Sequence, residues 1–173
     1  MASQQAAIDR LQMAVIDGRT ENIRYRQDQL QALHAALRND AGAICNALAK
    51  DSQTSSAEVE TEYYLAMDTV RHWYETLDFP EEHKKEYAPV VEGKDNATRR
   101  VGIGLVIIRP TSHTRLYSII APLAAAMSAG NCIAVEVSLL STPCVSHCAD
   151  RVTSSRTPFS KSMPSFAKCF PLH

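Results

Sequence analysis

Apolar residues recur at helical spacing through the first half of the chain. Ile8, Leu11 and Val15 mark a first segment, which Gly18 ends. A second stripe runs between Thr20 and about Lys50, with Arg, Gln and Asp on its other face; its apolar members are Leu30, Leu33, Leu37, Ile44 and Leu48. Residues three and four apart lie on one side of a helix, so this pattern predicts helices that each bury one face.

A third helix is predicted after the polar break at residues 51–58. Ser55 or Ser56 can cap its start, and Glu58 falls in its first turn. Its stripe consists of Val59, Tyr63, Met67, Val70, Tyr74 and Leu77, and it ends before Pro80. We expect its four aromatic residues to pack in the core; these are Tyr63, Tyr64, Trp73 and Tyr74.

The second half of the chain changes to a strand–helix–strand pattern. Leu105–Ile108 is a short, fully apolar run, which predicts a strand buried on both faces. A helix of small residues follows at about 116–129, stops at the Gly130-Asn131 pair and leads into a second strand at 132–137. Gly102-x-Gly104 precedes the first strand instead of following it, so it is not a dinucleotide-binding fingerprint.

These patterns divide the chain into four parts. They are an N-terminal helical region (1–79), a charged connector with two prolines (80–100), a partial Rossmann-like βαβ unit (101–140) and a tail (141–173). The fold class is therefore α/β, with N-terminal helices followed by an incomplete Rossmann-like βαβ unit. The tail is rich in Ser, Pro and Lys and shows no apolar period, so we expect it to be disordered or aberrant. Its Cys and His residues lack the spacing of a zinc site, and no metal is expected.

Composition narrows the function classes. Apolar residues make up 45% of the chain and charged residues 21%, which is typical of a soluble globular protein. The net charge is −1, so the sequence does not show the excess of basic residues that is typical of nucleic-acid-binding proteins. Residues 116–135 include no charged residue, and this stretch is long enough to cross a bilayer. Pro122 and the helix break at Gly130-Asn131 argue against a membrane span. Five cysteines and a start without an apolar h-region predict reduced thiols and a cytoplasmic location.

Three segments carry a resemblance to a known family. They read "RTENIRYRQDQLQALHAALRNDAGAICNALAKD", "VGIGLVIIRP" and "APLAAAMSAGNCIAVEVS". Together they resemble the amino-terminal third of an aldehyde dehydrogenase, nearest to the class 3-like branch with its fungal members, over roughly residues 19–141. The family motifs in question are a "PLGVVLII" strand, a "P.NYP" turn and a "PL..A.AAGN.vv.KPSE" segment. The resemblance implies the family reaction, which is NAD(P)-dependent oxidation of an aldehyde to a carboxylic acid.

The chain differs from the family pattern at positions that have functional roles in the family. In the family, the Asn of "NYP" helps to form the oxyanion hole, but here the loop reads "RPTSHTRLY", with Ser112 or His113 at that place. Glu136 replaces the family's Lys that holds the cofactor's ribose, and Leu139 replaces its Glu. The family's phosphate-binding Gly loop, Glu base and Cys nucleophile lie further along than this chain extends. We therefore expect NAD(P) to bind poorly, no other cofactor, and no dehydrogenase activity.

Two alternative functions stay open. In the first, the fold is repurposed as a cofactor-independent isomerase or cyclase of a biosynthetic pathway. His113 and Glu136 would then be the catalytic acid/base pair, with Arg109 or Arg115 binding an anion. In the second, the chain is a non-catalytic partner of a full-length relative. A βαβ fragment leaves apolar faces uncovered, so we expect self-association or pairing with such a relative.

Overall fold

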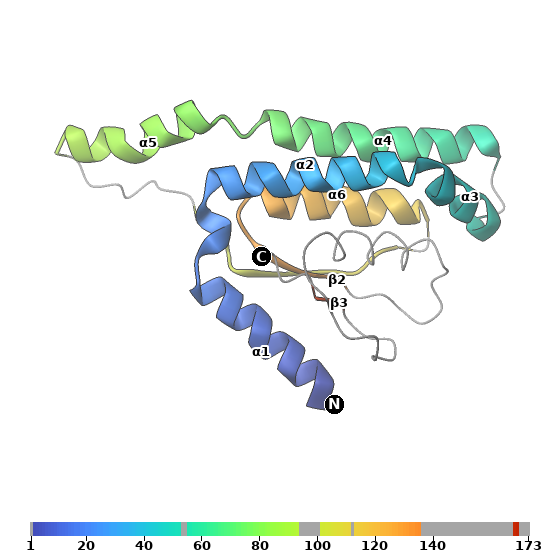
Figure 1. Ribbon diagram of the computed structural model, residues 1–173, viewed down its shortest axis with the longest axis horizontal. Coiled ribbons are helices and arrows are strands. Elements are labelled where there is room, and N and C mark those ends of the chain that lie inside the picture. The colour runs from blue at the N-terminus through green and yellow to red at the C-terminus, as the bar shows by residue number, and fades with distance from the viewer. Residues whose placement is uncertain (1, 53–54, 94–100, 112, 136–167, 170–173) are drawn as a thin grey trace.

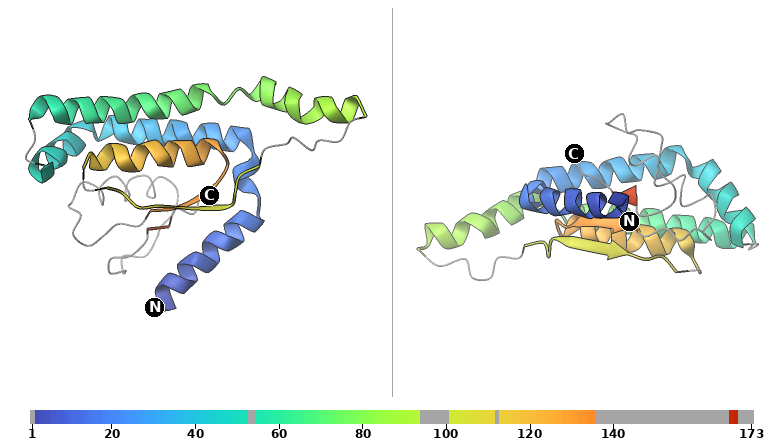
Figure 2. Two further views of the ribbon diagram at one scale, coloured as in Figure 1. Left: turned by 180° about the vertical axis from the view of Figure 1, so that it is seen from behind. Right: turned by 90° about the horizontal axis from the view of Figure 1, so that it is seen from below.

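Three long helices form a layer on one face of a small sheet. The computed structural model describes residues 2–52, 55–93, 101–111, 113–135 and 168–169. Helices α2 (Ile23–Asn39), α4 (Ser56–Glu75) and α6 (Arg115–Ser128) lie side by side in this layer (Figure 1). Helix α1 (Ala2–Ile16) crosses the opposite face of the sheet, and α3 (Ala41–Ser52) follows α2 at one end of the layer (Figure 2).

The sheet is built around one parallel pair of strands. Strands β1 (Leu105–Ile108) and β2 (Cys132–Val135) run parallel with Leu105 opposite Cys132, and α6 connects them. The two-residue strand β3 (Lys168–Cys169) pairs antiparallel with β2, which gives the order β1-β2-β3. The predicted strand–helix–strand order is confirmed and agrees with an α/β fold. The complete Rossmann-like unit and the four-part domain division stay predictions.

The stripes predicted between Thr20 and Lys50 and between Val59 and Leu77 supply much of the core. The buried residues of α2 are Leu30, Leu33 and Leu37, and those of α6 and the strands include Ile120, Leu123, Ile108, Ile133 and Val135. Each such side chain contributes about 1.5–3 kcal/mol when it is fully removed from water. The aromatic set divides: Tyr63 and Trp73 pack against the core, as predicted. The prediction is wrong for Tyr64 and Tyr74, which are exposed. Tyr64 lies outside the predicted stripe, and Tyr74, a member of it, falls in the last turn of α4.

Local capping sets where the helices begin. Ser55 and Glu58 form a capping box at the start of α4, in which each side chain bonds the other residue's backbone N–H. At α2, the side chain of Asn22 accepts a hydrogen bond from Arg24 N at 2.9 Å. The single stripe predicted from Thr20 to Lys50 is divided between α2 and α3, with a break at Asp40.

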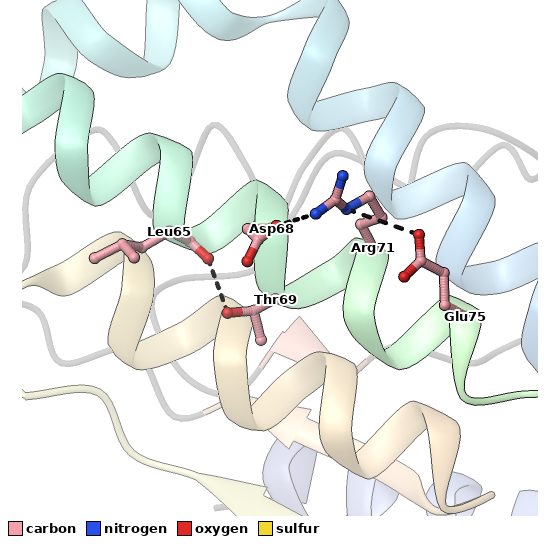
Figure 3. A network of polar contacts seen from close by, with 5 residues as sticks. All are labelled: Leu65, Asp68, Thr69, Arg71 and Glu75. Atoms are coloured by element: carbon pink, nitrogen blue, oxygen red, sulfur yellow. Dashed lines mark hydrogen bonds and ion pairs between the residues drawn. The ribbon is translucent and has the colours of Figure 1, made fainter.

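The outer face of α4 carries the polar contacts of a solvated helix. Arg71 pairs with Asp68 at 2.6 Å and with Glu75 at 3.8 Å, and the hydroxyl of Thr69 donates to the carbonyl of Leu65 at 2.8 Å (Figure 3). Arg71 and Glu75 are largely exposed and Asp68 is about half exposed, so these pairs contribute only about 0.2–0.5 kcal/mol each. This face of α4 is turned toward solvent, and none of the predicted site residues lies on it.

The predicted connector contains a helix. Helix α5 (Phe79–Val91) begins with Pro80 in its first turn, where a missing N–H costs nothing, and Glu81 and Glu82 favour the same turn. The guanidinium of Arg24 lies 4.4 Å above the ring of Phe79 and attaches the start of α5 to α2. Figure 1 shows α5 extending past the ends of the other helices.

One face of β1 is not covered. The prediction that Leu105–Ile108 is buried on both faces is wrong, because the side chain of Ile107 is 65% exposed. Val106 and Ile108 pack toward the helical layer, whereas α1 does not shield Ile107 on the other face. Within the described ranges, no helix is long and apolar enough to cross a membrane.

A close approach of two backbones joins the strands at their amino ends. Asn131 is buried; its Oδ1 accepts from Gly104 N at 3.1 Å, and its Nδ2 donates to the carbonyl of Ala126 at 3.3 Å. A Cβ atom placed on Gly102 would lie 2.5 Å from the carbonyl oxygen of Gly130. Gly102 is therefore needed for packing against the Gly130-Asn131 turn, whereas Gly104 has a positive φ of 113° and approaches Val15 of α1.

The structure predicts opposite effects for two Gly-to-Ala substitutions. Gly102→Ala should lower the free energy of unfolding by about 1–3 kcal/mol, because the added methyl group collides with the Gly130 carbonyl. Gly42→Ala in α3 should raise it by about 0.5–1 kcal/mol, because its Cβ would have no atom within 4 Å and Ala favours a helix. Urea unfolding of both variants measures the difference. Equal effects would contradict the close approach at Gly102.

Candidate functional site

The loop between β1 and α6 lies at the carboxyl edge of the parallel pair, where open α/β sheets bind ligands. Two of the four predicted site residues, Arg109 and His113, lie on it, and a third, Arg115, directly follows it. His113 and Arg109 are exposed, and Arg115 is half-buried at the first position of α6. Both arginines interact with other groups in the chain. The structure thus brings these three residues together on one short segment.

Hydrogen bonds hold this loop in one conformation. The hydroxyl of Thr111 donates to the carbonyl of His113 at 2.7 Å, and the backbone N–H of Thr111 donates to Ser118 Oγ at 3.3 Å. Ser118 in turn donates to the carbonyl of Arg115 at 3.0 Å. Thr114 adopts left-handed backbone angles (φ 43, ψ 56), which a β-branched residue rarely tolerates. The loop therefore stores strain next to His113.

A carboxylate from α4 occupies the start of α6. Glu62 accepts a hydrogen bond from Tyr117 N at 3.1 Å, while Thr114 provides no side-chain cap. The N-terminus of a helix carries a partial positive charge, so Glu62 stabilises α6. A phosphate at this terminus would meet the carboxylate, so the described residues here do not fit the diphosphate of a dinucleotide. Sequence reasoning missed Glu62, because nothing in its spacing signals a contact with a residue 55 positions away.

The predicted partner of His113 cannot be placed. Glu136 and Ser112 lie outside the described residues. Ile108 and Val135 are paired at the ends of their strands, so the residues that follow both strands leave the sheet at the same edge. The pairing of His113 with Glu136 stays a prediction.

The thiol of Cys132 lies at the other end of the sheet. It is the first residue of β2, whereas His113 follows the end of β1, and a four-residue strand separates the two ends by about 10 Å. Cys132 is buried; burial raises the pKa of its thiol, and a hydrogen bond with Thr20 opposes this rise only in part. A raised pKa disfavours the reactive thiolate. Cys45 on α3 is half-buried against the core, as predicted for a packing residue.

No cluster of potential metal ligands occurs among the residues that the structure describes. The side chains of Cys144, Cys148 and Cys169 and of His147 and His173 lie outside them, so the tail is not tested on this point.

Comparison with known proteins identifies relatives in one family. No family model matches the chain. It is 30% identical to aldehyde dehydrogenase family 3 member B1 of Bos taurus over 142 residues, which are 78% of this chain and 29% of that protein. The Mus musculus protein of the same name is 29% identical over 149 residues, 82% of this chain and 31% of the relative. For the Homo sapiens protein the identity is 30% over 140 residues, 76% of this chain and 29% of the relative.

The chain spans about three tenths of the length of these curated relatives. The matched residues make up about four fifths of the chain, which agrees with the extent of the motifs in the sequence. Over that stretch, the chain is a divergent relative of the family 3 aldehyde dehydrogenases, as its motifs predict.

Proposed function

We propose that this chain is an aldehyde dehydrogenase-like protein that does not itself oxidise aldehydes. The position of Cys132 carries this proposal. Aldehyde oxidation needs a thiolate, a hydride acceptor and a base held together. Cys132 is buried at the amino end of β2, away from the loop edge at which ligands bind, and burial raises its pKa.

The electrostatics of the loop edge support the same proposal. The carboxylate of Glu62 lies on the helix terminus nearest this edge, and Glu136 stands where the family has a Lys. Two negative charges near a cofactor's phosphates would oppose binding by direct repulsion. NAD(P) would supply the hydride acceptor in the family reaction, and these residues do not favour it.

Activity and binding assays test the proposal together. The full chain, incubated with NAD or NADP and a panel of aldehydes, should give no sustained growth in absorbance at the NADH wavelength. NAD should also leave its unfolding temperature unchanged, because a ligand that binds the native state must raise it. An active family 3 aldehyde dehydrogenase, assayed in parallel, provides the positive control. Sustained NADH production by the purified chain would refute the proposal.

The reactivity of Cys132 gives an independent prediction. At neutral pH, iodoacetamide should modify Cys132 at least ~10-fold more slowly in the folded chain than in urea, because the thiol is buried and its thiolate disfavoured. Peptide mass spectrometry measures the rate, with the half-buried Cys45 as an internal comparison. Faster modification of Cys132 in the folded chain would indicate an activated nucleophile.

The same pKa shift predicts a loss of stability at alkaline pH. The folded chain retains the Cys132 proton at pH values where the unfolded chain has released it. The resulting stabilisation is fully present below about pH 8.5, the ordinary thiol pKa, and is lost as the pH rises through the higher folded value. The difference in unfolding free energy between the wild type and Cys132→Ala should therefore shrink between neutral and strongly alkaline pH.

A second candidate function is acid/base catalysis without a cofactor, of the isomerase or cyclase type. The strained backbone of Thr114 favours it, because such strain concentrates at functional sites, and His113 is its neighbour. An imidazole beside a carboxylate can accept a proton at neutral pH, and the carboxylate stabilises the imidazolium that forms. Glu136 would be that carboxylate, and Arg109 or Arg115 would hold an anionic substrate group.

Substitutions distinguish this candidate from an inert loop. His113→Ala and Glu136→Gln should lower an isomerase or cyclase turnover by ~10²- to 10⁴-fold, which is the usual contribution of a positioned acid or base. His72→Ala, on the exposed face of α4, and Cys45→Ala should leave it nearly unchanged. Steady-state rates of the four variants provide the measurement. A full rate in His113→Ala would eliminate the candidate.

A further inference from the structure

Helix α6 begins differently from α2 and α4. Asn22 before α2 and Ser55 before α4 adopt extended backbone angles, and each side chain accepts a hydrogen bond from an N–H of the first turn. Thr114 occupies the same position before α6, since its carbonyl accepts from Ser118 N at 2.8 Å. Its backbone is left-handed, however, and its hydroxyl makes no cap bond.

The N–H that a cap at Thr114 would bond is already bonded by another residue. Tyr117 lies three positions after Thr114, which is the spacing of Ser55 and Glu58 in the capping box of α4. Here the carboxylate of Glu62, on α4, accepts from Tyr117 N at 3.1 Å. Glu62 and the hydroxyl of Thr114 are therefore alternative acceptors for one donor.

Two contacts hold Thr114 in its left-handed conformation. Glu62 occupies the donor of Tyr117, and the hydroxyl of Thr111 donates to the carbonyl of His113 at 2.7 Å. That carbonyl belongs to the peptide group that turns when φ of Thr114 changes. A threonine rarely adopts a positive φ, and in the extended conformation it is a preferred cap residue. Loss of Glu62 would thus remove one contact and leave the Tyr117 N–H to the hydroxyl of Thr114.

We propose that Glu62 selects between two conformations of the loop before α6. With Glu62 bonded to Tyr117 N, Thr114 is left-handed, as in the structure. When Glu62 leaves, Thr114 turns to the extended conformation, its hydroxyl caps α6, and the peptide group between His113 and Thr114 rotates. The imidazole of His113 moves with that peptide group, so α4 controls the position of the predicted acid/base residue.

The groups that exchange lie at the surface. Thr114 and Tyr117 are exposed, and Glu62 is half-buried. A strained residue persists only while its surroundings hold it, so the conformation of Thr114 depends on the contacts just described. The inference concerns the backbone and is independent of the proposed loss of dehydrogenase activity. It also stands whether or not His113 takes part in a reaction.

A double-mutant cycle on the full chain, followed by urea unfolding, tests the proposal. Thr114→Val keeps the shape of the side chain and removes the hydroxyl; alone it should have little effect, because the hydroxyl makes no cap bond in the wild type. Glu62→Ala alone should also cost little, because Thr114 replaces the lost acceptor. Together they should lower the folding equilibrium constant at least ~5-fold beyond the product of the single effects, which is the usual contribution of a cap.

Glu60→Ala is the matched control for this cycle. Glu60 is an exposed carboxylate on α4, two positions before Glu62. Its effect should combine with that of Thr114→Val without any excess. If Glu62→Ala combines with Thr114→Val in the same independent way, the two residues do not compete for one donor and the proposal is wrong.

Two local measurements separate this exchange from a simple loss of a cap. In Glu62→Ala, the carbon chemical shifts of Thr114 should change from left-handed to extended values, whereas Glu62→Gln retains an acceptor oxygen and should leave them in place. The amide of Tyr117 should stay protected from hydrogen exchange in Glu62→Ala and exchange at least ~5-fold faster once Thr114→Val is added. Unchanged Thr114 shifts in Glu62→Ala, or equal exchange in the single and double variants, would overturn the proposal.

Discussion

The buried amide of Asn131 is the contact on which the rest of the fold depends. It accepts from Gly104 N and donates to the carbonyl of Ala126, so one side chain joins the start of β1 to the end of α6. Arg26 holds the same turn from outside, by donating to the carbonyl of Ser128 at 2.7 Å. Loss of the amide would leave a buried N–H without a partner, which costs about 1–3 kcal/mol. Close approach of the glycines depends on this arrangement.

The amino ends of the strands are buried, and the loop that follows the carboxyl end of β1 is exposed. The Asn131 turn, Thr20 and Cys132 are all buried at the amino ends, whereas the loop with His113 is exposed and strained at Thr114. The thiol of Cys132 belongs to the buried amino ends, where burial raises its pKa. Near the same loop, the carboxylate of Glu62 accepts a hydrogen bond from Tyr117 N at the N-terminus of α6. It takes the position at this terminus that the phosphate of a ligand could otherwise occupy.

Sequence patterns predict those features that depend on neighbours in the chain. The stripe of α2, a serine cap at the start of α4 and the strand at residues 105–108 follow from local spacing and were predictable. Helix α5 was not, because Pro80 reads as a breaker unless it falls in the first turn. The exposure of Ile107 and the contact of Glu62 with Tyr117 depend on which elements meet in space, and a short apolar run reads alike whether one face or both are covered.

The side of the sheet that faces the helical layer is more deeply buried than the other side. Helices α2, α4 and α6 enclose a continuous core with one another and with the inner faces of the strands. Only α1 among the described helices crosses the opposite face, and it leaves Ile103 and Ile107 in water. Of the two cysteines whose side chains the structure describes, Cys45 packs against the core from α3 and Cys132 lies at the amino end of β2, away from the loop edge at which open α/β sheets bind ligands.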